Sequence, residues 1–384
     1  MPKVYNWQLG RDMQYEYDAS RPDLQVAAVF DINKCIGCQT CTLACKTTWT
    51  SGKGQEYMLW NSVETKPWGS YPMGWDVRIL DMMGKQYWDT TGPNPVFFGK
   101  TIFEKAPEGE RGLGWRPEDL DWAHPNRGED ETSGGLDPAN HHMQLPHQVW
   151  QFYLARICNH CTYPGCLAAC PRKAIYKRKE DGVVLIDQQR CRGYRECVKA
   201  CPYKRPMYNH VTRVSEKCIF CYPAIEKGII PRCMRNCIGK IRIVGFVSKP
   251  EKADRENPID FLVHVKKVAL PLYPHLGLEP NVYYIPPINV PAPFLRQMFG
   301  PRAEAAVETY KRMRTGQEQE RELRAVLLLS VSSPVLLRKF RLDGDEAVGY
   351  DAAGAEVVRV PFVEPQIVRP YQDPATGAYR HNIT

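Results

Sequence analysis

The sequence lacks any long apolar run. A helix that crosses a bilayer needs about 18 consecutive, mostly apolar residues, and polar or charged residues interrupt every stretch of that length among the 384 residues. The N-terminus, M-P-K-V-Y-N-W-Q-L-G-R, has neither the apolar segment nor the twin-arginine motif of an export signal. We therefore expect no transmembrane segment and no export signal on this chain, and membrane association only through partners.

Two further features of the sequence narrow the possible functions. No residue pattern resembles a general base or an activated nucleophile, so we expect no catalytic residue here. Lys and Arg number 51 against 43 Asp and Glu, a net charge of +8. Such an excess can indicate nucleic-acid binding. The cysteine motifs imply bound groups of negative charge that basic residues would offset, so we expect no nucleic-acid partner.

Cysteine, in contrast, is abundant: 15 residues fall into four groups. Bacterial ferredoxins hold cubane iron–sulfur clusters with a C-x2-C-x2-C-x3-C-P run, whose fourth cysteine ligates the other cluster of a pair. The groups follow this spacing, with extra residues before the third cysteine in groups two and four. We expect the first three cysteines on a tight loop and the fourth at the start of a helix, pointing the opposite way. Group one is Cys35, Cys38, Cys41 and Cys45; group two is Cys158, Cys161, Cys166 and Cys170; group three is Cys191, Cys197 and Cys201; group four is Cys218, Cys221, Cys233 and Cys237.

Group three lacks one cysteine, because Tyr194 stands at the second position of its motif. A ferredoxin run with one ligand missing can hold a three-iron cluster, since no thiolate retains the iron at the vacant corner. The 15 cysteines then divide into three 4Fe–4S sites and one 3Fe–4S site, and every thiol is used. The cofactors predicted from spacing are therefore three four-iron clusters and one three-iron cluster.

The fourth-cysteine rule also predicts which groups share clusters. Groups two and three are close in sequence and form one pair, and groups one and four then pair by elimination across the chain. This gives four ligand sets, which we name A to D. Set A is Cys35, Cys38, Cys41 and Cys237; set B is Cys45, Cys218, Cys221 and Cys233; set C is Cys158, Cys161, Cys166 and Cys201; set D is Cys170, Cys191 and Cys197.

Zinc binding and disulfide formation fit the cysteine pattern less well. C-x2-C pairs also bind zinc, but zinc sites rarely take three cysteines from one loop and a distant fourth. Disulfides are disfavoured by the odd cysteine count. His141, His142 and His147 could ligate a haem or a metal, although clustered loop histidines are more often surface residues. We expect His160, inside group two, to donate a hydrogen bond near a cluster.

The predicted fold class is α+β, with two paired bacterial-ferredoxin-like modules, long insertions and an extended C-terminal docking region. The entry F-D-I-N-K-C before group one recurs as I-D-Q-Q-R-C before group three, which indicates duplicated modules. We expect strands at Val26–Phe30 and Ile241–Val247, a hairpin around Asp181-Gly182, and a helix from Ala303 to Leu329. The predicted regions are an N-terminal arm (1–23), a first module (24–45 plus 211–248), a partner-facing insertion (46–148), a second module (149–210) and the docking region (249–384).

Several segments together resemble one protein family. They include C-I-G-C-Q-T-C-T-L-A-C-K-T-T-W-T-S-G-K-G-Q-E-Y-M from Cys35, N-S-V-E-T-K-P from Asn61, F-Y-L-A-R-I-C-N-H-C-T-Y-P from Phe152, and P-R-K-A-I-Y-K-R from Pro171. These resemble iron–sulfur beta subunits of the type II branch of the DMSO reductase family of molybdenum enzymes. V-Y-N-W-Q-L-G-R, V-A-L-P-L-Y-P and L-R-Q-M-F-G-P look most like nitrite oxidoreductase beta subunits, beside those of nitrate reductases.

The resemblance implies a non-catalytic electron-transfer subunit of an oxidoreductase complex. Its partners would be an alpha subunit with the molybdenum cofactor, nearest set A, and a haem-bearing gamma subunit, nearest set D. It implies a periplasmic location, reached by co-export with a signal-bearing partner, in preference to the cytoplasm. Two alternatives stay open: the beta subunit of a (per)chlorate or selenate reductase or of a dimethylsulfide or ethylbenzene dehydrogenase, and a free-standing polyferredoxin.

Overall fold

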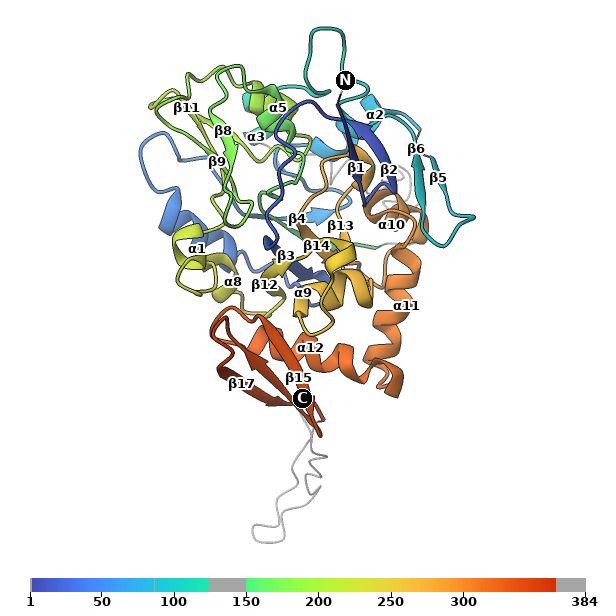
Figure 1. Cartoon of the computed structure of the whole chain (residues 1–384). Helices are drawn as coiled ribbons and strands as arrows, with labels where there is room; N and C mark the ends of the chain where they lie inside the picture. The colour runs from blue at the N-terminus through green and yellow to red at the C-terminus, as the bar shows by residue number, and fades with distance from the viewer. Residues whose placement is uncertain (1, 86, 124–149, 364–384) are drawn as a thin grey trace, which may run out of the picture.

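The computed structural model describes residues 2–85, 87–123 and 150–363, and a four-stranded sheet lies at its centre (Figure 1). The strand order is β12 (Arg242–Val247), β3 (Gln25–Asp31), β14 (Val282–Ile285) and β13 (Leu270–Pro271). Strand β3 pairs antiparallel with β12 and parallel with β14. All seven residues of β3 are buried, as its run of Val, Ala and Phe predicts for a strand covered on both faces. The strands expected at Val26–Phe30 and Ile241–Val247 are thus confirmed.

The pairing of β3 with β12 brings together segments that are far apart in sequence. Strand β3 leads through the 3-10 turn η1 (Ile32–Lys34) into group one, whose last two cysteines lie on helix α1 (Thr40–Trp49). Strand β12 follows group four, in which Cys221 is the N-cap of α7 (Tyr222–Ile225) and Cys233 lies in α8 (Arg232–Arg235). Helices α1 and α8 pack against each other, so groups one and four lie side by side (Figure 1).

Groups two and three lie in a compact region of short elements. The hairpin expected around Asp181-Gly182 is present, with β8 (Ile175–Lys177) antiparallel to β9 (Val184–Ile186). Short helices α5 (Gly165–Ala169) and α6 (Glu196–Ala200) pack together. The region is completed by the antiparallel pair of β10 (Met207–Asn209) and β11 (Val214–Glu216) and by β7 (Phe152–Arg156).

The N-terminal arm is a hairpin that packs on its own chain. Strands β1 (Lys3–Asn6) and β2 (Arg11–Gln14) pair antiparallel, and Leu9, Met13 and Tyr15 are buried in a small apolar cluster. The Leu9 carbonyl accepts a hydrogen bond from the backbone N–H of Phe97 in a second hairpin, β5 (Tyr87–Asp89) with β6 (Val96–Phe98). Burial of these apolar side chains ties the arm to this subunit.

The described part of the 46–148 insertion is more regular than its weak periodicity suggests. It contains β4 (Ser62–Lys66), which pairs with β7, and helices α2 (Trp75–Met83) and α3 (Asp119–Ala123). Met58, Trp75 and Ile79 are fully buried in the main core. Tertiary burial of large side chains therefore orders a stretch that lacks a helical or strand period. His141, His142 and His147 lie outside the described residues.

The C-terminal region covers the other face of the sheet with a second apolar core. The helix expected from Ala303 to Leu329 is two helices, α11 (Ala303–Arg314) and α12 (Arg321–Ser332), because Gly316 breaks it in a left-handed conformation at φ +75. Part of the proline-rich stretch before them is helical, α10 (Ala292–Phe299). The remaining elements are η2 (Pro250–Lys252), α9 (Pro258–Asp260), the π-helix η3 (Phe261–Val265), η4 (Pro274–Leu276), η5 (Glu318–Glu320), and the sheet of β15 (Lys339–Asp343), β16 (Glu346–Tyr350) and β17 (Glu356–Pro361).

Across residues 2–85, 87–123 and 150–363, no helix has the length and apolar character that a membrane crossing requires.

Candidate iron–sulfur site

In no group does the fourth cysteine lie at the start of a helix, so the expectation that it begins one was wrong. In groups two and three the helix carries the third cysteine, and the fourth, Cys170 or Cys201, is its C-cap. In group one both Cys41 and Cys45 lie within α1. The two residues are four positions apart, about 6 Å of rise along the helix axis. That displacement along the axis lets neighbouring cysteines serve different sites.

Glycines let the loops before these helices turn tightly. Gly37 and Gly193 occupy equivalent positions in groups one and three, and both have left-handed backbones, with φ of +67 and +66. A Cβ at Gly193 would lie 2.4 Å from the Arg213 carbonyl oxygen. Only glycine fits this conformation and spacing without strain.

The structure brings the thiols of set A together at the surface. Cys35, Cys38, Cys41 and Cys237 line one cavity. Burial raises the pKa of Cys35, and the charges of Cys41 and Cys237 raise it further. Cys38 is exposed, and hydrogen bonds from Thr40 lower its pKa.

Set B is fully buried. Its four thiols also line one cavity. Burial raises the pKa of Cys45 strongly, and the charges of the three partner thiols raise it further. The indole N–H of Trp49 donates to Cys221 Sγ at 3.2 Å, and the backbone N–H of Phe220 donates to Cys218 Sγ at 3.4 Å.

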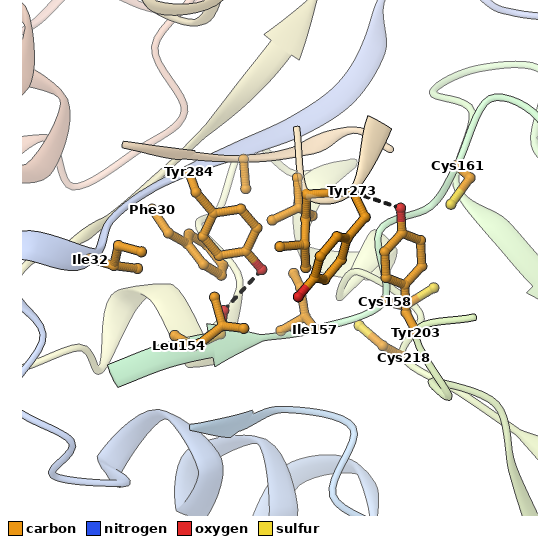
Figure 2. Close-up of a cluster of buried hydrophobic side chains, with 14 of the residues drawn as sticks. Phe30, Ile32, Leu154, Ile157, Cys158, Cys161, Tyr203, Cys218, Tyr273 and Tyr284 are labelled. Carbon is orange, nitrogen blue, oxygen red and sulfur yellow. Dashed lines mark hydrogen bonds between the residues drawn. The ribbon is translucent and has the colours of Figure 1, made fainter. Parts of the chain in front are cut away.

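Set C is buried as well and lines a third cavity. Burial raises the pKa of Cys161, followed by the charges of Cys158, Cys201 and Cys166. Figure 2 shows Cys158 and Cys161 beside Tyr203, within the same apolar cluster as Tyr273 and Tyr284. The Tyr203 hydroxyl donates to the Leu272 carbonyl at 2.8 Å, which anchors this wall of the site.

Set D is the set of three thiols, and it is partly exposed. Burial raises the pKa of Cys197 to about 12, with further increases from Cys191 and Cys170. Backbone N–H groups of Ala174 and Ser215 donate to the other two sulfurs, Cys170 at 3.3 Å and Cys191 at 3.4 Å. The Tyr194 side chain, at the position of the missing cysteine, is 58% exposed.

Thiols of neighbouring sets also influence one another, and this gives the order of the sets. The charge of Cys41 in set A raises the pKa of Cys233 in set B, after the larger effects of burial and Cys221. Burial and then Cys158 of set C raise the pKa of Cys218 in set B. The pKa of Cys197 in set D is raised by burial and, less strongly, by the charge of Cys201 in set C. Each set is therefore a neighbour of the next in the order A, B, C, D, and we call this succession the line of sets.

The cavities hold hydrogen-bond donors that have no acceptor among the described residues. They are Arg242 Nε beside set A, Trp60 Nε1 beside set B and His160 Nε2 beside set C. A buried donor without a partner is costly. Thiolate ligands and inorganic sulfide of an iron–sulfur cluster are acceptors of the right charge. The residues present thus fit such a cluster in each of these three cavities.

His160 is consistent with the donor role expected from its place in group two. Its Nδ1 accepts a hydrogen bond from the backbone N–H of Val184 at 3.0 Å, so the ring proton belongs on Nε2. Burial, and then the nearby Lys217, hold its pKa well below the usual range, which keeps the ring neutral. In the described part of the chain, no three His, Cys, Asp or Glu side chains are placed to hold a single metal ion.

Sequence reasoning missed Arg242, Lys217 and the two tryptophans around set B. Arg242 opens strand β12, and its Nη2 donates to Cys41 Sγ at 3.0 Å. Lys217 precedes Cys218 directly, and its Nζ lies 3.7 Å from Cys158 Sγ. The sequence V-S-E-K-C shows that Lys217 adjoins Cys218, but the direction in which the lysine side chain points depends on the fold.

Comparison with known proteins agrees with these observations. A family model described as a 4Fe-4S dicluster domain matches residues 149–247. The selenate reductase subunit beta of Thauera selenatis is 45% identical over 308 residues, 74% of this chain and 89% of the relative. The chlorate reductase subunit beta of Ideonella dechloratans is 46% identical over 311 residues, with the same two coverages. The respiratory nitrate reductase subunit beta of Haloferax mediterranei is 41% identical over 367 residues, 86% of this chain and 99% of the relative.

Fold, thiols and family model together define an iron–sulfur protein of mixed helix and strand content with a 4Fe–4S dicluster, ferredoxin-like domain. The extent of the similarity goes further. The chain belongs to the family of iron–sulfur beta subunits of DMSO reductase family molybdoenzymes, the electron-transfer subunits of those complexes.

Proposed function

We propose that this chain relays electrons through three 4Fe–4S clusters and one 3Fe–4S cluster, held by sets A, B and C and by set D. The fold would then consist of two paired ferredoxin-like modules, one built from groups one and four and the other from groups two and three. A cluster held by such a set would take up and release one electron, and no bond of the complex's substrate would be made or broken there. The chain supplies the thiols, the N–H donors and the fixed spacing.

One observation carries this proposal: the line of sets begins and ends at the surface and is buried between. Cys38 of set A is exposed, and Cys35 is half-buried. Cys170 and Cys191 of set D are also half-buried, whereas every thiol of sets B and C is buried. A protein that carries electrons between partners, and meets one partner at a time, needs only one accessible cluster. Two accessible ends suit a relay between two partners and argue against a free-standing polyferredoxin.

The partner at the set A end would be the alpha subunit with the molybdenum cofactor. Exposed apolar side chains lie close to set A cysteines in the chain: Ile36 follows Cys35, Leu43 lies two residues after Cys41, and Ile238 follows Cys237; they are 61%, 63% and 63% exposed. Exposed apolar residues grouped in this way are typical of an interface. A haem-bearing gamma subunit would face the half-buried thiols of set D.

For the substrate of the complex, we propose nitrogen oxides, in a nitrite oxidoreductase or nitrate reductase. The nitrate reductase relative aligns with 86% of this chain, and the N-terminal and proline-rich segments resemble nitrite oxidoreductase beta subunits. A second candidate is an oxyanion reductase for chlorate or selenate, because those relatives are more identical, at 46% and 45%, over a shorter span. A periplasmic location by co-export is part of the first proposal.

The test uses the native complex, purified without oxygen. Nitrite oxidation with a high-potential acceptor and nitrate reduction with a viologen donor are measured, beside chlorate and selenate reduction. Turnover of nitrite or nitrate supports the nitrogen-oxide assignment. Turnover of chlorate or selenate alone, by a complex with molybdenum and all clusters, transfers the assignment to the second candidate. Fractionation of the source cells tests the periplasmic location.

A further inference from the structure

Four buried cations, Lys204, Arg205, Lys217 and Arg242, have no carboxylate partner among the described residues, and two of them, Arg242 and Lys217, have a nitrogen within 3.0 Å and 3.7 Å of a cysteine sulfur. Arg242 is 5% exposed and Lys217 is 2% exposed, and neither forms an ion pair with Asp or Glu in that part of the chain. The buried cations Arg156 and Lys66, in contrast, pair with Glu64 and Asp76. A buried charge is costly unless an opposite charge lies close. For Arg242 and Lys217, the nearest groups that can carry the opposite charge are cysteine thiols.

Arg242 lies at the junction of sets A and B. Its Nη2 donates to Cys41 Sγ of set A at 3.0 Å, and its Nη1 donates to Asn61 Oδ1 at 2.6 Å. Its guanidinium carbon stands 4.5 Å from the centre of the Phe30 ring, which fixes the plane of the group. Its charge also acts on Cys233 of set B. The strongest attractive charges around it are thiolates of both sets.

Lys217 holds the corresponding position between sets B and C. Its Nζ donates to the backbone carbonyls of Val184 and of Cys218, the latter at 3.1 Å. The same nitrogen lies 3.7 Å from Cys158 Sγ of set C. Its charge acts on a second set C thiol, Cys166. Two carbonyls thus aim the ammonium group between a set B ligand and the set C thiols.

We propose that Arg242 and Lys217 are positioning residues for electron transfer, each a fixed positive charge shared by two successive clusters. Arg242 serves the clusters of sets A and B, and Lys217 serves those of sets B and C. The inference rests on the proposed function, since it requires clusters in these sets. A nearby positive charge favours the reduced, more negative form of a cluster, and so raises its reduction potential. Because each cation acts on both neighbours, it raises both potentials together, so the difference between the two potentials changes less than either potential does.

The test is a potentiometric titration of the whole complex, followed by EPR, with single substitutions. Arg242→Gln lowers the potentials of the set A and set B clusters and leaves set D unchanged. Lys217→Gln lowers those of sets B and C and leaves set D unchanged. Each reduction equilibrium changes at least tenfold, about 59 mV for a one-electron couple. Set B is the one cluster that both substitutions shift.

Two controls separate charge from packing. Arg242→Lys keeps the charge and is expected to leave the potentials of sets A and B close to those of the unmodified complex. Arg255→Gln removes an arginine whose side chain is 63% exposed and pairs with Glu322 on the surface, and no potential changes. Should Arg242→Gln fail to assemble, Lys217→Gln and Arg242→Lys still decide the matter.

Unshifted potentials in Lys217→Gln, or a loss in Arg242→Lys as large as that in a neutral variant, would overturn the proposal. A change in the reduction potential of only one of the two clusters beside Arg242 or Lys217 would also overturn it. Failure of the proposed function is distinguishable from these outcomes. It would be seen in the unmodified complex, as missing clusters, before any substitution is made.

Discussion

Cys158 and Cys218 face each other across the boundary between the two predicted modules. The charge of Cys158 is the largest contribution, after burial, to the raised pKa of Cys218, and both thiols lie in the apolar cluster shown in Figure 2. One belongs to group two and the other to group four, 60 residues later in the chain. Through this contact the two halves of the cysteine pattern form one continuous line of thiol sets.

The missing ligand of group three gives the first prediction. Tyr194→Cys supplies a thiol at the second position of the motif, and the loop there is accessible because the Tyr194 side chain is 58% exposed. We expect the three-iron EPR signal of the oxidised protein to disappear and one more iron to be bound. Tyr194→Phe is the matched control and retains the signal. A full three-iron signal in the cysteine variant would count against set D as the three-iron site.

The place of Cys45 among cysteines of group four gives the second prediction. Cys45 is in group one by sequence but lies with Cys218, Cys221 and Cys233 in the structure. We therefore expect Cys45→Ser and Cys218→Ser to abolish or alter the same cluster, while Cys35→Ser affects a different one. EPR of the three reduced variants makes the comparison. If Cys45→Ser instead matched Cys35→Ser, the ligand sets would be wrong.

Iron removal is expected to destabilise the folded protein strongly. Eight of the cysteines are part of the main apolar core, and without clusters Arg242 and Lys217 lose their nearby negative charge. Ligation energy of metal sites contributes directly to folding. Chelation of iron under reducing conditions should lower the thermal unfolding midpoint by more than about 10 °C, measured by circular dichroism. A midpoint unchanged after complete iron loss would show that the clusters are not structural.

The apolar surface at the set A end predicts a defined interface. Leu43→Glu places a charge between two cysteines of group one, where the leucine is 63% exposed. We expect it to weaken association with the catalytic subunit at least about tenfold, the scale of a central interface residue, without loss of iron. Leu24→Glu, at a leucine that is 43% exposed, is the control. Equal co-purification of both variants would place the interface elsewhere.

Glu279 predicts a pH dependence of stability. Burial raises its pKa to about 7, against the opposing effect of Arg21, whose Nη1 lies 3.1 Å from its Oε1. The unfolded carboxyl group has its ordinary pKa of 4.5, so between pH 4.5 and 7 the folded chain binds the additional proton. Stability from this group is complete below pH 4.5 and is lost as the pH rises through 7.

Glu279→Gln should remove that dependence. Denaturant unfolding at pH 5.5 and pH 8, followed by tryptophan fluorescence, is expected to show a smaller difference between the two pH values in the variant. A tenfold difference in proton affinity corresponds to about 1.4 kcal/mol. Glu180→Gln, at a side chain that is 71% exposed, is the control and changes nothing. An identical pH difference in all three proteins contradicts the assignment.

Sequence alone predicted the elements with strong local signals. Spacing grouped the cysteines, and the strands at β3, β8, β9 and β12 followed from apolar runs and the Asp181-Gly182 turn. The break at Gly316 between α11 and α12 was missed although residues 314–322, R-T-G-Q-E-Q-E-R-E, contain no large apolar side chain. Nothing local indicates that Arg242 reaches Cys41, since 201 residues separate the two. The ordered structure of the insertion around Trp75 likewise depends on contacts with residues far away in the sequence, which no local pattern indicates.

The most direct test of the account is a stepwise reduction of the native complex followed by EPR at low temperature. The account predicts four separately titrating centres on this subunit, three of the four-iron type and one of the three-iron type, with magnetic interactions between neighbours in the order A, B, C, D. Fewer than four centres, no three-iron signal, or an interaction between centres A and D in place of B and C would contradict it.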